Sequence, residues 1–435
     1  MSKTRKPELA VIGAGPAGLG AVLAASKAGL KDIMLIERDI ELGGILPQCI
    51  HDGFGSIVFK EVLTGPQYAQ RFIDEVERAN VDVKLRTMVL EMTGGPGITA
   101  VNESEGIIEI EPKSVVLAMG CRERSRHQVM LPGFRPAGVI TAGAAQRDIN
   151  IEGLMPGRKI VMLGSGDIGL IMARRFVLEG AEVEGVYEIM DHPGGLTRNV
   201  VQCLNDFDIP LHLSHTATFI HGRKRVEAVS VAQVDGDLKP INDTERRVPC
   251  DTLVLSVGLI PENELSRHAG VELDPVTSGP FVDERMETSV DGIFACGNVV
   301  NVFDLVDYVT RSAEVAGRGA AEYVLEGRKR KTPVRVVPGR NVKYVVPQYV
   351  SDLDRDIDFY FRVEHPERAV SARILADGKP LAGKKHRMVR PPEMIKQSAS
   401  AADFAGAGGA REITVEVVAV EENSKKGSGT NAKGS

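Results

Sequence analysis

The chain has 435 residues, of which 43% are hydrophobic and 26% charged, with a formal net charge of −6 at pH 7. This length allows two or three domains, each with its own core. A negative net charge offers no basic field to nucleic acid or anionic lipid, so neither partner is expected. No run approaches the roughly 20 apolar residues of a membrane-spanning helix, and the first residues do not resemble a signal peptide. We therefore expect a cytoplasmic protein without a transmembrane segment.

A β-α-β pattern opens the chain. Residues 8–13 form a short apolar run, a glycine-rich turn follows, residues 16–29 have a helical pattern, and residues 33–37 form a second apolar run. The turn Gly13-Ala14-Gly15-Pro16-Ala17-Gly18 has the G-x-G-x-x-G spacing between strand and helix. Such glycines allow a sharp turn and a close backbone approach to a pyrophosphate, which the helix N-terminus then stabilises. An acid at the end of the second strand, Glu37, is placed to accept from ribose hydroxyls.

The same pattern recurs further along the chain. A strand is predicted at 158–164, a helix as far as about residue 179, and a strand at 182–188, with the turn Gly164-Ser165-Gly166-Asp167-Ile168-Gly169 after the first strand. From first glycine to terminal acid the spacing is 24 residues in both copies, Gly13 to Glu37 and Gly164 to Glu188. The repetition predicts two dinucleotide-binding domains of the Rossmann type.

The acid of the second copy bears on which nucleotide binds there. Glu188 accepts from a free ribose 2′-hydroxyl and repels a 2′-phosphate, and no arginine follows it in EIMDHPGG. NAD is therefore expected in preference to NADP, with Gly164, Gly166 and Gly169 forming the turn around it. Asp167, also a candidate for contact with the nucleotide, is better explained as a capping residue of the helix.

Further segments complete the predicted fold. An amphipathic helix is expected at about 304–326, and from 331 onward short β-rich runs are separated by proline and glycine. The fold class is α/β, with two Rossmann-like three-layer domains and a small C-terminal β-rich domain. The last stretch, at 421–435, lacks apolar anchors and is expected to be disordered.

Two such domains in one chain resemble the two-dinucleotide-binding-domain flavoproteins, the superfamily of thioredoxin reductase and glutathione reductase. Residues 115–124, VVLAMGCRER, are similar to that family's crossover strand, and residues 288–298, TSVDGIFACGN, to its second FAD motif. The resemblance implies an FAD-binding domain at 1–120 and 245–330 and an NAD-binding domain at 121–244, followed by the β-rich domain at 331–420. Asn298 departs from the family pattern, in which an aspartate bonds the ribityl chain.

The motifs and the resemblance together give one set of candidate residues for FAD. They are Gly13, Gly15, Pro16, Ala17, Gly18, Glu37, Arg38, Gly43, Gly44, Gln48, Val89, Ala118, Met119, Gly120, Gly297, Asn298 and Val309. The helix around Val309 resembles the family helix whose N-terminus faces the flavin, although packing explains Tyr308 and Val309 equally well.

The five cysteines set this chain apart from the disulfide reductases. Cys49, Cys121, Cys203, Cys250 and Cys296 are widely spaced and include no C-x-x-C pair, so neither a dithiol relay nor a metal site of this chain's own is expected. Cys121 and Cys296 are expected in the core. Cys49 follows the glycine doublet alone, and together with His51 it is the candidate for a catalytic thiol. A buried structural cysteine is the commoner explanation.

The segments LAMGCRER, VITAGAAQ and FACGNVV, and the β-rich tail with PPEM at 391–394, resemble more closely those of nicotinamide-dependent flavoprotein subunits of heteromeric dehydrogenases, such as the alpha subunits of sarcosine oxidase and dye-linked proline dehydrogenase. Closest are bacterial oxidoreductases associated with a glycerol-3-phosphate dehydrogenase. This implies electron transfer between NAD and FAD in an oligomer or hetero-complex with a partner dehydrogenase flavoprotein and a small cysteine-containing subunit. The alternatives are a stand-alone NADH oxidase or peroxidase that uses Cys49, and a partner-docking protein whose FAD is structural.

Overall fold

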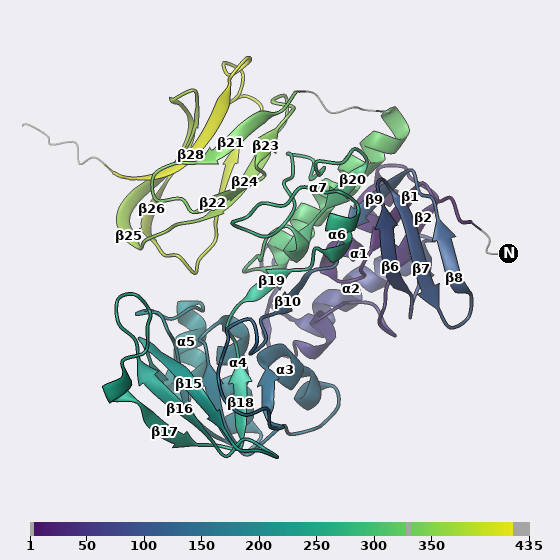
Figure 1. Ribbon diagram of the computed structural model, residues 1–435. Coiled ribbons are helices and arrows are strands. Elements are labelled where there is room, and N and C mark those ends of the chain that lie inside the picture. Colours follow the sequence, from purple (N-terminus) through teal and green to yellow (C-terminus); the bar gives the residue numbers. More distant parts are fainter. Residues whose placement is uncertain (1–3, 328–331, 421–435) are drawn as a thin grey trace, which may run out of the picture. The chain divides into compact units, whose positions relative to one another are not determined.

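The computed structural model describes residues 4–327 and 332–420. The chain divides into two compact units, the first ending at Pro333 and the second beginning at Val334, and each is described by itself (Figure 1). The predicted tail at 421–435 lies outside the described residues.

The first nucleotide domain is built on a five-stranded parallel sheet with the order β20-β9-β1-β2-β5. Its elements are β1 (Leu9–Ile12), α1 (Pro16–Lys27), β2 (Ile33–Ile36), η1 (Leu46–Gln48), β3 (Asp52–Phe54), β4 (Leu63–Thr64), α2 (Gly65–Arg78), β5 (Asp82–Lys84), β6 (Met88–Thr93), β7 (Gly97–Asn102), β8 (Gly106–Ile110), β9 (Ser114–Leu117), α6 (Glu264–His268), β20 (Ile293–Ala295), η4 (Gly297–Val299) and α7 (Val306–Glu326). Strands β1, β2 and β9 are continuous buried runs because both faces of the sheet are covered.

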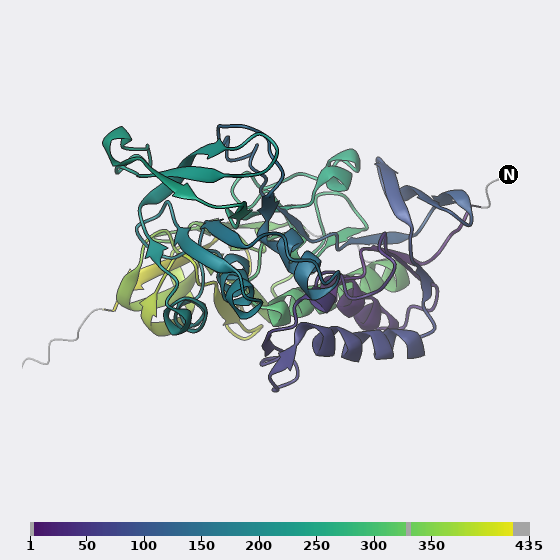
Figure 2. The same cartoon turned by 90° about the horizontal axis from the view of Figure 1, so that it is seen from below.

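Helices α1 and α7 pack on each other through small residues (Figures 1 and 2). A Cβ added at Gly317 would lie 2.2 Å from the carbonyl oxygen of Ala21, and one at Gly20 would lie 3.2 Å from Cβ of Ala313. The two backbones therefore approach closely, which fixes the amino ends of both helices beside the same sheet.

The segment 83–92, VKLRTMVLEM, is divided between two strands. Arg86 has a φ of 49°, a left-handed conformation that ends β5. The chain then enters β6, which belongs to a separate antiparallel sheet with the order β6-β7-β8. The candidate Val89 thus lies on this second sheet rather than on the parallel one.

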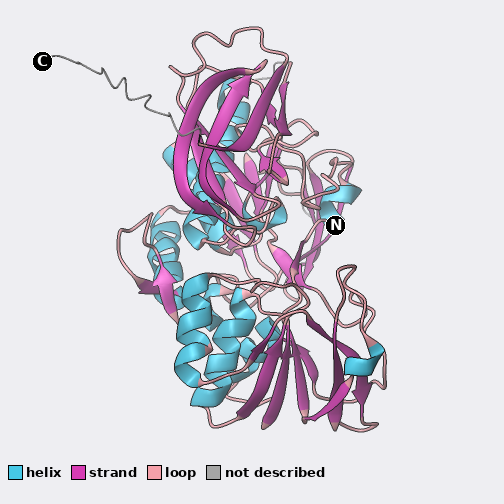
Figure 3. Ribbon diagram, turned by 90° about the vertical axis from the view of Figure 1, so that its left-hand side faces the viewer, coloured by secondary structure: helices cyan, strands magenta, loops and turns pink. Residues whose placement is uncertain are grey.

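The second nucleotide domain has its own five-stranded parallel sheet, with the order β11-β18-β12-β13-β14. Its elements are β11 (Val139–Thr141), α3 (Ala142–Asn150), β12 (Lys159–Leu163), α4 (Asp167–Leu178), β13 (Glu182–Tyr187), α5 (Thr197–Cys203), η2 (Asn205–Phe207), β14 (Leu211–His212), β15 (His215–His221), β16 (Ala228–Gln233), η3 (Asn242–Thr244), β17 (Arg246–Pro249) and β18 (Thr252–Leu255). Ile160 and Met162 of β12 join the core under α3 and α4, whereas Val161 and Leu163 join the core under β15, β16 and β17. Helices therefore cover one face of the sheet and antiparallel strands the other (Figure 3).

Two short strands connect these domains. β10 (Cys121–Glu123) and β19 (Leu259–Pro261) pair antiparallel, with Cys121 opposite Pro261. The chain leaves the first domain along β10 and returns along β19, so the first domain is assembled from two separate segments of sequence.

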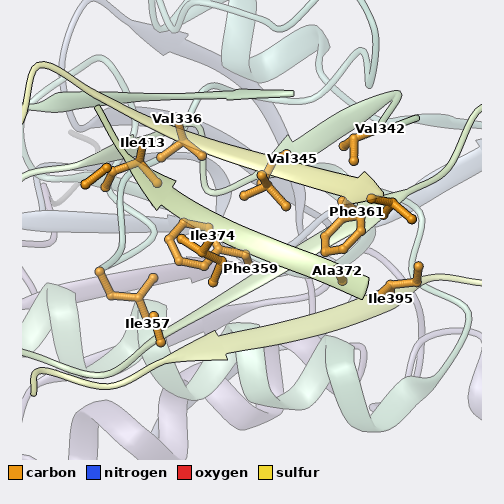
Figure 4. Close-up of a cluster of buried hydrophobic side chains, with 14 of the residues drawn as sticks. Val336, Val342, Val345, Ile357, Phe359, Phe361, Ala372, Ile374, Ile395 and Ile413 are labelled. Atoms are coloured by element: carbon orange, nitrogen blue, oxygen red, sulfur yellow. The ribbon is translucent and has the colours of Figure 1, made fainter. Parts of the chain in front are cut away.

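Over residues 334–420, the part of the second unit that the structure describes, the regular structure consists of strands. Its strands are β21 (Val334–Pro338), β22 (Tyr344–Val346), β23 (Tyr349–Val350), β24 (Ile357–Arg362), β25 (Glu367–Ala376), β26 (Lys379–Val389), β27 (Ile395–Ala399) and β28 (Glu412–Ala419). They form a five-stranded sheet, β23-β21-β28-β25-β26, and a three-stranded sheet, β22-β24-β27. Phe359 and Phe361 of the smaller sheet pack with Ile374 and Ile413 of the larger one (Figure 4). This unit thus has a hydrophobic core of its own.

Candidate functional site

The first glycine-rich turn leaves bare backbone at the amino end of α1. Gly13 has a φ of 97°, and a Cβ there would lie 2.6 Å from the carbonyl oxygen of Ala118. A Cβ on Gly18 would lie 1.8 Å from the carbonyl oxygen of Gly13, so helix and turn meet without side chains. α1 begins at Pro16 and has no acidic residue in its first turn. Aligned N–H groups without a competing carboxylate suit an anion, so this turn fits a pyrophosphate.

Glu37 is fixed against this turn. One oxygen of its carboxylate accepts from the backbone N–H of Ala14 at 2.7 Å, and the other accepts from the N–H of Asp39 at 2.8 Å. Only 7% of Glu37 is exposed, whereas its neighbour Arg38 is exposed. A carboxylate has about four acceptor positions, so further bonds to ribose hydroxyls remain possible.

The glycine doublet Gly43-Gly44 packs against the turn that begins at Gly13. The N–H of Gly43 donates to the carbonyl oxygen of Ala14 at 2.9 Å, and a Cβ on Gly44 would lie 2.8 Å from Cα of Gly15. Two backbones therefore meet with no room for a side chain.

The ends of β9 and β20 complete the surroundings of this turn. A Cβ on Gly297 would lie 2.7 Å from Cβ of Ala17 and 3.1 Å from Cγ1 of Val309, so these three candidates converge at the amino ends of α1 and α7. Met119 and Gly120 follow β9 and are partly exposed. The candidates Ala118 and Val89 are buried, with exposed fractions of 5% and 6%.

The amide of Asn298 is bonded to the protein on both sides. Its Oδ1 accepts from the N–H of Phe303 at 3.0 Å, and its Nδ2 donates to Sγ of Cys121 at 3.6 Å. Cys121 is only partly buried, so its expected core position is wrong, whereas Cys296 is fully buried as expected. The contact with Asn298 exists because β10 carries Cys121 past the end of β20.

The second turn repeats the first in detail. A Cβ on Gly164 would lie 2.2 Å from the carbonyl oxygen of Ser256, and one on Gly169 would lie 2.5 Å from Cβ of Ser256. The carboxylate of Glu188 accepts from the N–H of Ser165 at 2.9 Å and from that of Met190 at 3.0 Å. Gly166 ends the turn as the N-cap of α4.

The predicted capping role of Asp167 is wrong. The extended backbone of Gly166 makes that glycine the N-cap, with no side-chain capping bond, and Asp167 is already the first helical residue. Its Oδ1 accepts instead from the N–H of Leu196 at 2.8 Å and from Nδ2 of Asn199 at 2.6 Å. Asp167 therefore fastens the segment before α5 to the amino end of α4.

Cys49 and His51 do not form a pair. Cys49 is 9% exposed, and burial raises its pKa to about 12. Its thiol donates to the carbonyl oxygen of Ile45, while Nδ1 of His51 lies 3.0 Å from the carbonyl oxygen of Asp52 and its ring packs on Phe54. This surrounding favours the neutral thiol over a thiolate.

A buried contact joins the segment of Cys49 to α3. Nε2 of Gln48 donates to the carbonyl oxygen of Gly143 at 2.9 Å and to Oε1 of Gln146 at 3.1 Å. The same Oε1 lies 3.6 Å from Sγ of Cys49. Gln48 is a candidate for FAD binding. Its side-chain amide nitrogen therefore links the first domain to the second by hydrogen bonds. At the amino end of α3, Glu123 accepts from the N–H of Gly143 at 2.8 Å.

Sequence reasoning missed Asp307. This residue is 1% exposed in the first turn of α7, and its carboxylate accepts from the N–H groups of Gly55, Ile57 and Val58 at 3.2, 3.2 and 2.7 Å. It fixes the loop that follows β3. The only available signal was an acid at the start of a predicted helix, and that signal does not identify the distant loop.

Residues 4–327 and 332–420 contain no group of three or more His, Cys, Asp or Glu side chains that could hold a metal. Among the helices of the same ranges, none combines the length and the apolar composition needed to cross a membrane.

Residues 7–320 match the family described as pyridine nucleotide-disulphide oxidoreductase. An opine oxidase subunit from Agrobacterium tumefaciens is 27% identical over 335 residues, which cover 72% of this chain and 64% of the relative. Hydrogen cyanide synthase subunit HcnB of Pseudomonas protegens is 26% identical over 286 residues, covering 60% of this chain and 58% of the relative. The alignments thus span somewhat less than two thirds of either relative.

Thioredoxin reductase of T. acidophilum superposes with a TM-score of 0.59 at 22% identity, covering 73% of this chain and 98% of that one. L-proline dehydrogenase of P. horikoshii gives a TM-score of 0.51 at 21% identity, covering 75% and 57%. At these identities the likeness concerns the fold.

Proposed function

This chain belongs to the pyridine nucleotide-disulphide oxidoreductase family, and we propose that it is an FAD-dependent NAD(P)H oxidoreductase that transfers electrons between NAD(H) and FAD as one component of a larger, multi-component dehydrogenase. The observation that carries the nucleotide part is the pair of matching glycine turns, each with its acid bonded to the second residue of the turn.

The turn that begins at Gly13 would hold FAD and the turn that begins at Gly164 would hold NAD. When bound, FAD supplies the hydride acceptor or donor, and no acid or base of the protein is needed for that step. The amino ends of α1 and α4 would hold the two pyrophosphates, and Glu37 and Glu188 would bind the riboses.

NAD rather than NADP is the proposed nucleotide because of Glu188. Its carboxylate is anchored at both oxygens by backbone N–H groups of Ser165 and Met190. A carboxylate so fixed remains at the ribose position, where it accepts from a 2′-hydroxyl and repels a 2′-phosphate.

Anaerobic mixing with NADH tests the electron-transfer proposal. The absorbance of the purified flavoprotein at about 450 nm should fall on mixing, and NADPH should act more weakly. A flavin that is never bleached by either nucleotide would support the alternative in which FAD is only structural and the chain serves to dock a partner.

The proposal of a multi-component enzyme rests on the relatives. The opine oxidase and hydrogen cyanide synthase relatives are both named as subunits of their enzymes. Affinity purification from native cells should recover a partner dehydrogenase flavoprotein and a small cysteine-containing subunit. Recovery of the chain alone, with full turnover on a natural donor, would contradict this part of the proposal.

The alternative of a stand-alone oxidase or peroxidase that uses Cys49 has less support. Such a mechanism needs a thiolate, whereas burial raises the pKa of Cys49 to about 12 and His51 is bonded elsewhere.

A further inference from the structure

The internal repeat extends beyond the glycine turn and its acid. Gly43-Gly44 begins six residues after Glu37, and Gly194-Gly195 begins six residues after Glu188. The second doublet, like the first, packs closely against the glycine turn of its own domain. The N–H of Gly194 donates to Oγ of Ser165 at 2.8 Å, and a Cβ on Gly195 would lie 3.0 Å from the carbonyl oxygen of Ser165.

The chain that leaves this doublet is held at the amino end of α4. Asp167 accepts from the N–H of Leu196 and from the side chain of Asn199, which lie on either side of Arg198 in the sequence. The backbone of Arg198, in the first turn of α5, is thereby held near the amino end of α4.

The guanidinium of Arg198 reaches the first nucleotide domain. Nη2 lies 3.1 Å, Cζ 3.7 Å and Nη1 3.8 Å from the position that a Cβ on Gly53 would occupy. Gly53 belongs to β3, in the segment that follows Cys49 and leads to the loop fixed by Asp307. Arg198 therefore extends from the region of the second glycine turn toward the first nucleotide domain, where the flavin is expected.

Arg198 is exposed and makes no ion pair or hydrogen bond with any residue in the described part of the chain. This cation lies between the amino end of α4, which suits an anion, and the first nucleotide domain, where the flavin is expected. Because no carboxylate of the described residues pairs with it, it is available to bind phosphate.

We propose that Arg198 binds the diphosphate of the nicotinamide nucleotide, and that Asp167 and the Gly194-Gly195 doublet position it. This inference rests on the proposed function, because it assumes that the turn at Gly164 holds that nucleotide. It adds a side-chain contact to the backbone contacts that a glycine turn provides.

The test compares Arg198→Ala and Arg198→Lys with Arg247→Ala. Arg247 is an exposed arginine of β17, so the control removes the same charge from the same domain. Calorimetric titration of each FAD-loaded variant with NAD+ should show the Kd rising by roughly tenfold or more in Arg198→Ala, by less in Arg198→Lys, and not at all in the control.

A second measurement separates phosphate binding from damage to the flavin side. Dihydronicotinamide riboside, a hydride donor without phosphates, should reduce the flavin of Arg198→Ala at the wild-type rate, and the FAD content should be unchanged. The proposal is overturned if the Kd for NAD+ does not change, if reduction by the riboside slows as much as reduction by NADH, or if only NADPH binding is lost. If the wild-type protein neither binds NAD+ nor is reduced by NADH, the proposed function itself fails.

Discussion

Glu188 and Ser165 are joined by two hydrogen bonds, since the carboxylate accepts from the backbone N–H of Ser165 at 2.9 Å and from its hydroxyl at 2.5 Å. The same hydroxyl oxygen accepts from the N–H of Gly194. In the first domain the carboxylate of Glu37 accepts from the backbone N–H groups of Ala14 and Asp39, and Ala14 has no hydroxyl. Side chains thus tie the second turn to the loop after its acid, and the first turn relies on backbone bonds.

Replacing Glu188 should change the choice of nucleotide. In Glu188→Ala the acceptor for the 2′-hydroxyl and the charge that repels a 2′-phosphate are both lost, so the ratio of Kd for NADPH to Kd for NADH should fall by about tenfold. Anaerobic flavin titrations with each nucleotide measure this ratio. Glu182→Ala, at the exposed start of β13, is the control and should leave it unchanged. An unaltered ratio in Glu188→Ala would contradict the assignment of NAD.

Substitutions in the two glycine turns should have separate effects, one on the binding of FAD and the other on reduction by NADH. Gly18→Ala places a Cβ 1.8 Å from a backbone oxygen and should abolish FAD retention, read from the ratio of flavin to protein absorbance. Gly169→Ala places a Cβ 2.5 Å from Cβ of Ser256 and should leave FAD bound while NADH no longer reduces it. Gly94→Ala, which has no heavy atom within 4 Å, should resemble the wild type. Loss of FAD from Gly169→Ala but not from Gly18→Ala would reverse the proposed roles of the two turns.

The sequence predicted these turns well because their chemistry is local. Strand, turn, helix and acid lie within about 25 residues of one another in each copy, and the structure has β1, α1 and β2, and again β12, α4 and β13, where they were expected. The doublet at Gly194 was equally readable, since its distance from Glu188 equals that of Gly43 from Glu37.

Contacts between distant segments could not be read in the same way. Asp307 bonds a loop about 250 residues away, and Gln48 bonds α3 about 95 residues away. The wrong expectation for Asp167 has the same origin, because its partners Leu196 and Asn199 belong to another element. An acid at a helix start is compatible with a cap, a ligand contact or a tertiary bond, and only the fold decides among them.

Cys49 should be dispensable for hydride transfer. Cys49→Ser should retain NADH-dependent flavin reduction within about twofold, because a thiol whose pKa is about 12 stays protonated at neutral pH. Cys250→Ser, which replaces another buried thiol, controls for the general cost of the exchange. Near-complete loss of turnover in Cys49→Ser alone would instead favour the oxidase or peroxidase that uses this thiol.

The same thiol predicts a pH dependence of stability. Its pKa in the folded chain, about 12, lies above the value of about 8.5 for an unfolded thiol, so above pH 8.5 the folded state binds more protons than the unfolded state. Stability from this group is complete below that pH and is lost as the pH rises toward 12. Denaturant unfolding between pH 7 and 10 should therefore show a smaller loss of stability in Cys49→Ser than in the wild type.

Asp307 should stabilise the first unit through its loop. In Asp307→Ala the N–H groups of Gly55, Ile57 and Val58 lose their acceptor, and the free energy of unfolding should fall by about 3 kcal/mol. Asp307→Asn keeps one acceptor oxygen, which suffices for Ile57 and Val58 but not for Gly55, so it should lie between Asp307→Ala and the wild type. Denaturant unfolding of the FAD-loaded protein measures both variants.

A matched control shows whether this effect belongs to the loop. Asp291 is an exposed acid of the same unit, so Asp291→Ala removes the same charge without removing an acceptor from buried N–H groups. Its free energy of unfolding should stay within about 0.5 kcal/mol of the wild type. Because the three N–H groups lie in one short loop, Asp307→Ala should also speed hydrogen exchange at Gly55, Ile57 and Val58 more than elsewhere in the unit. Uniform acceleration over the whole unit would mean that Asp307 supports the helix α7 rather than this loop.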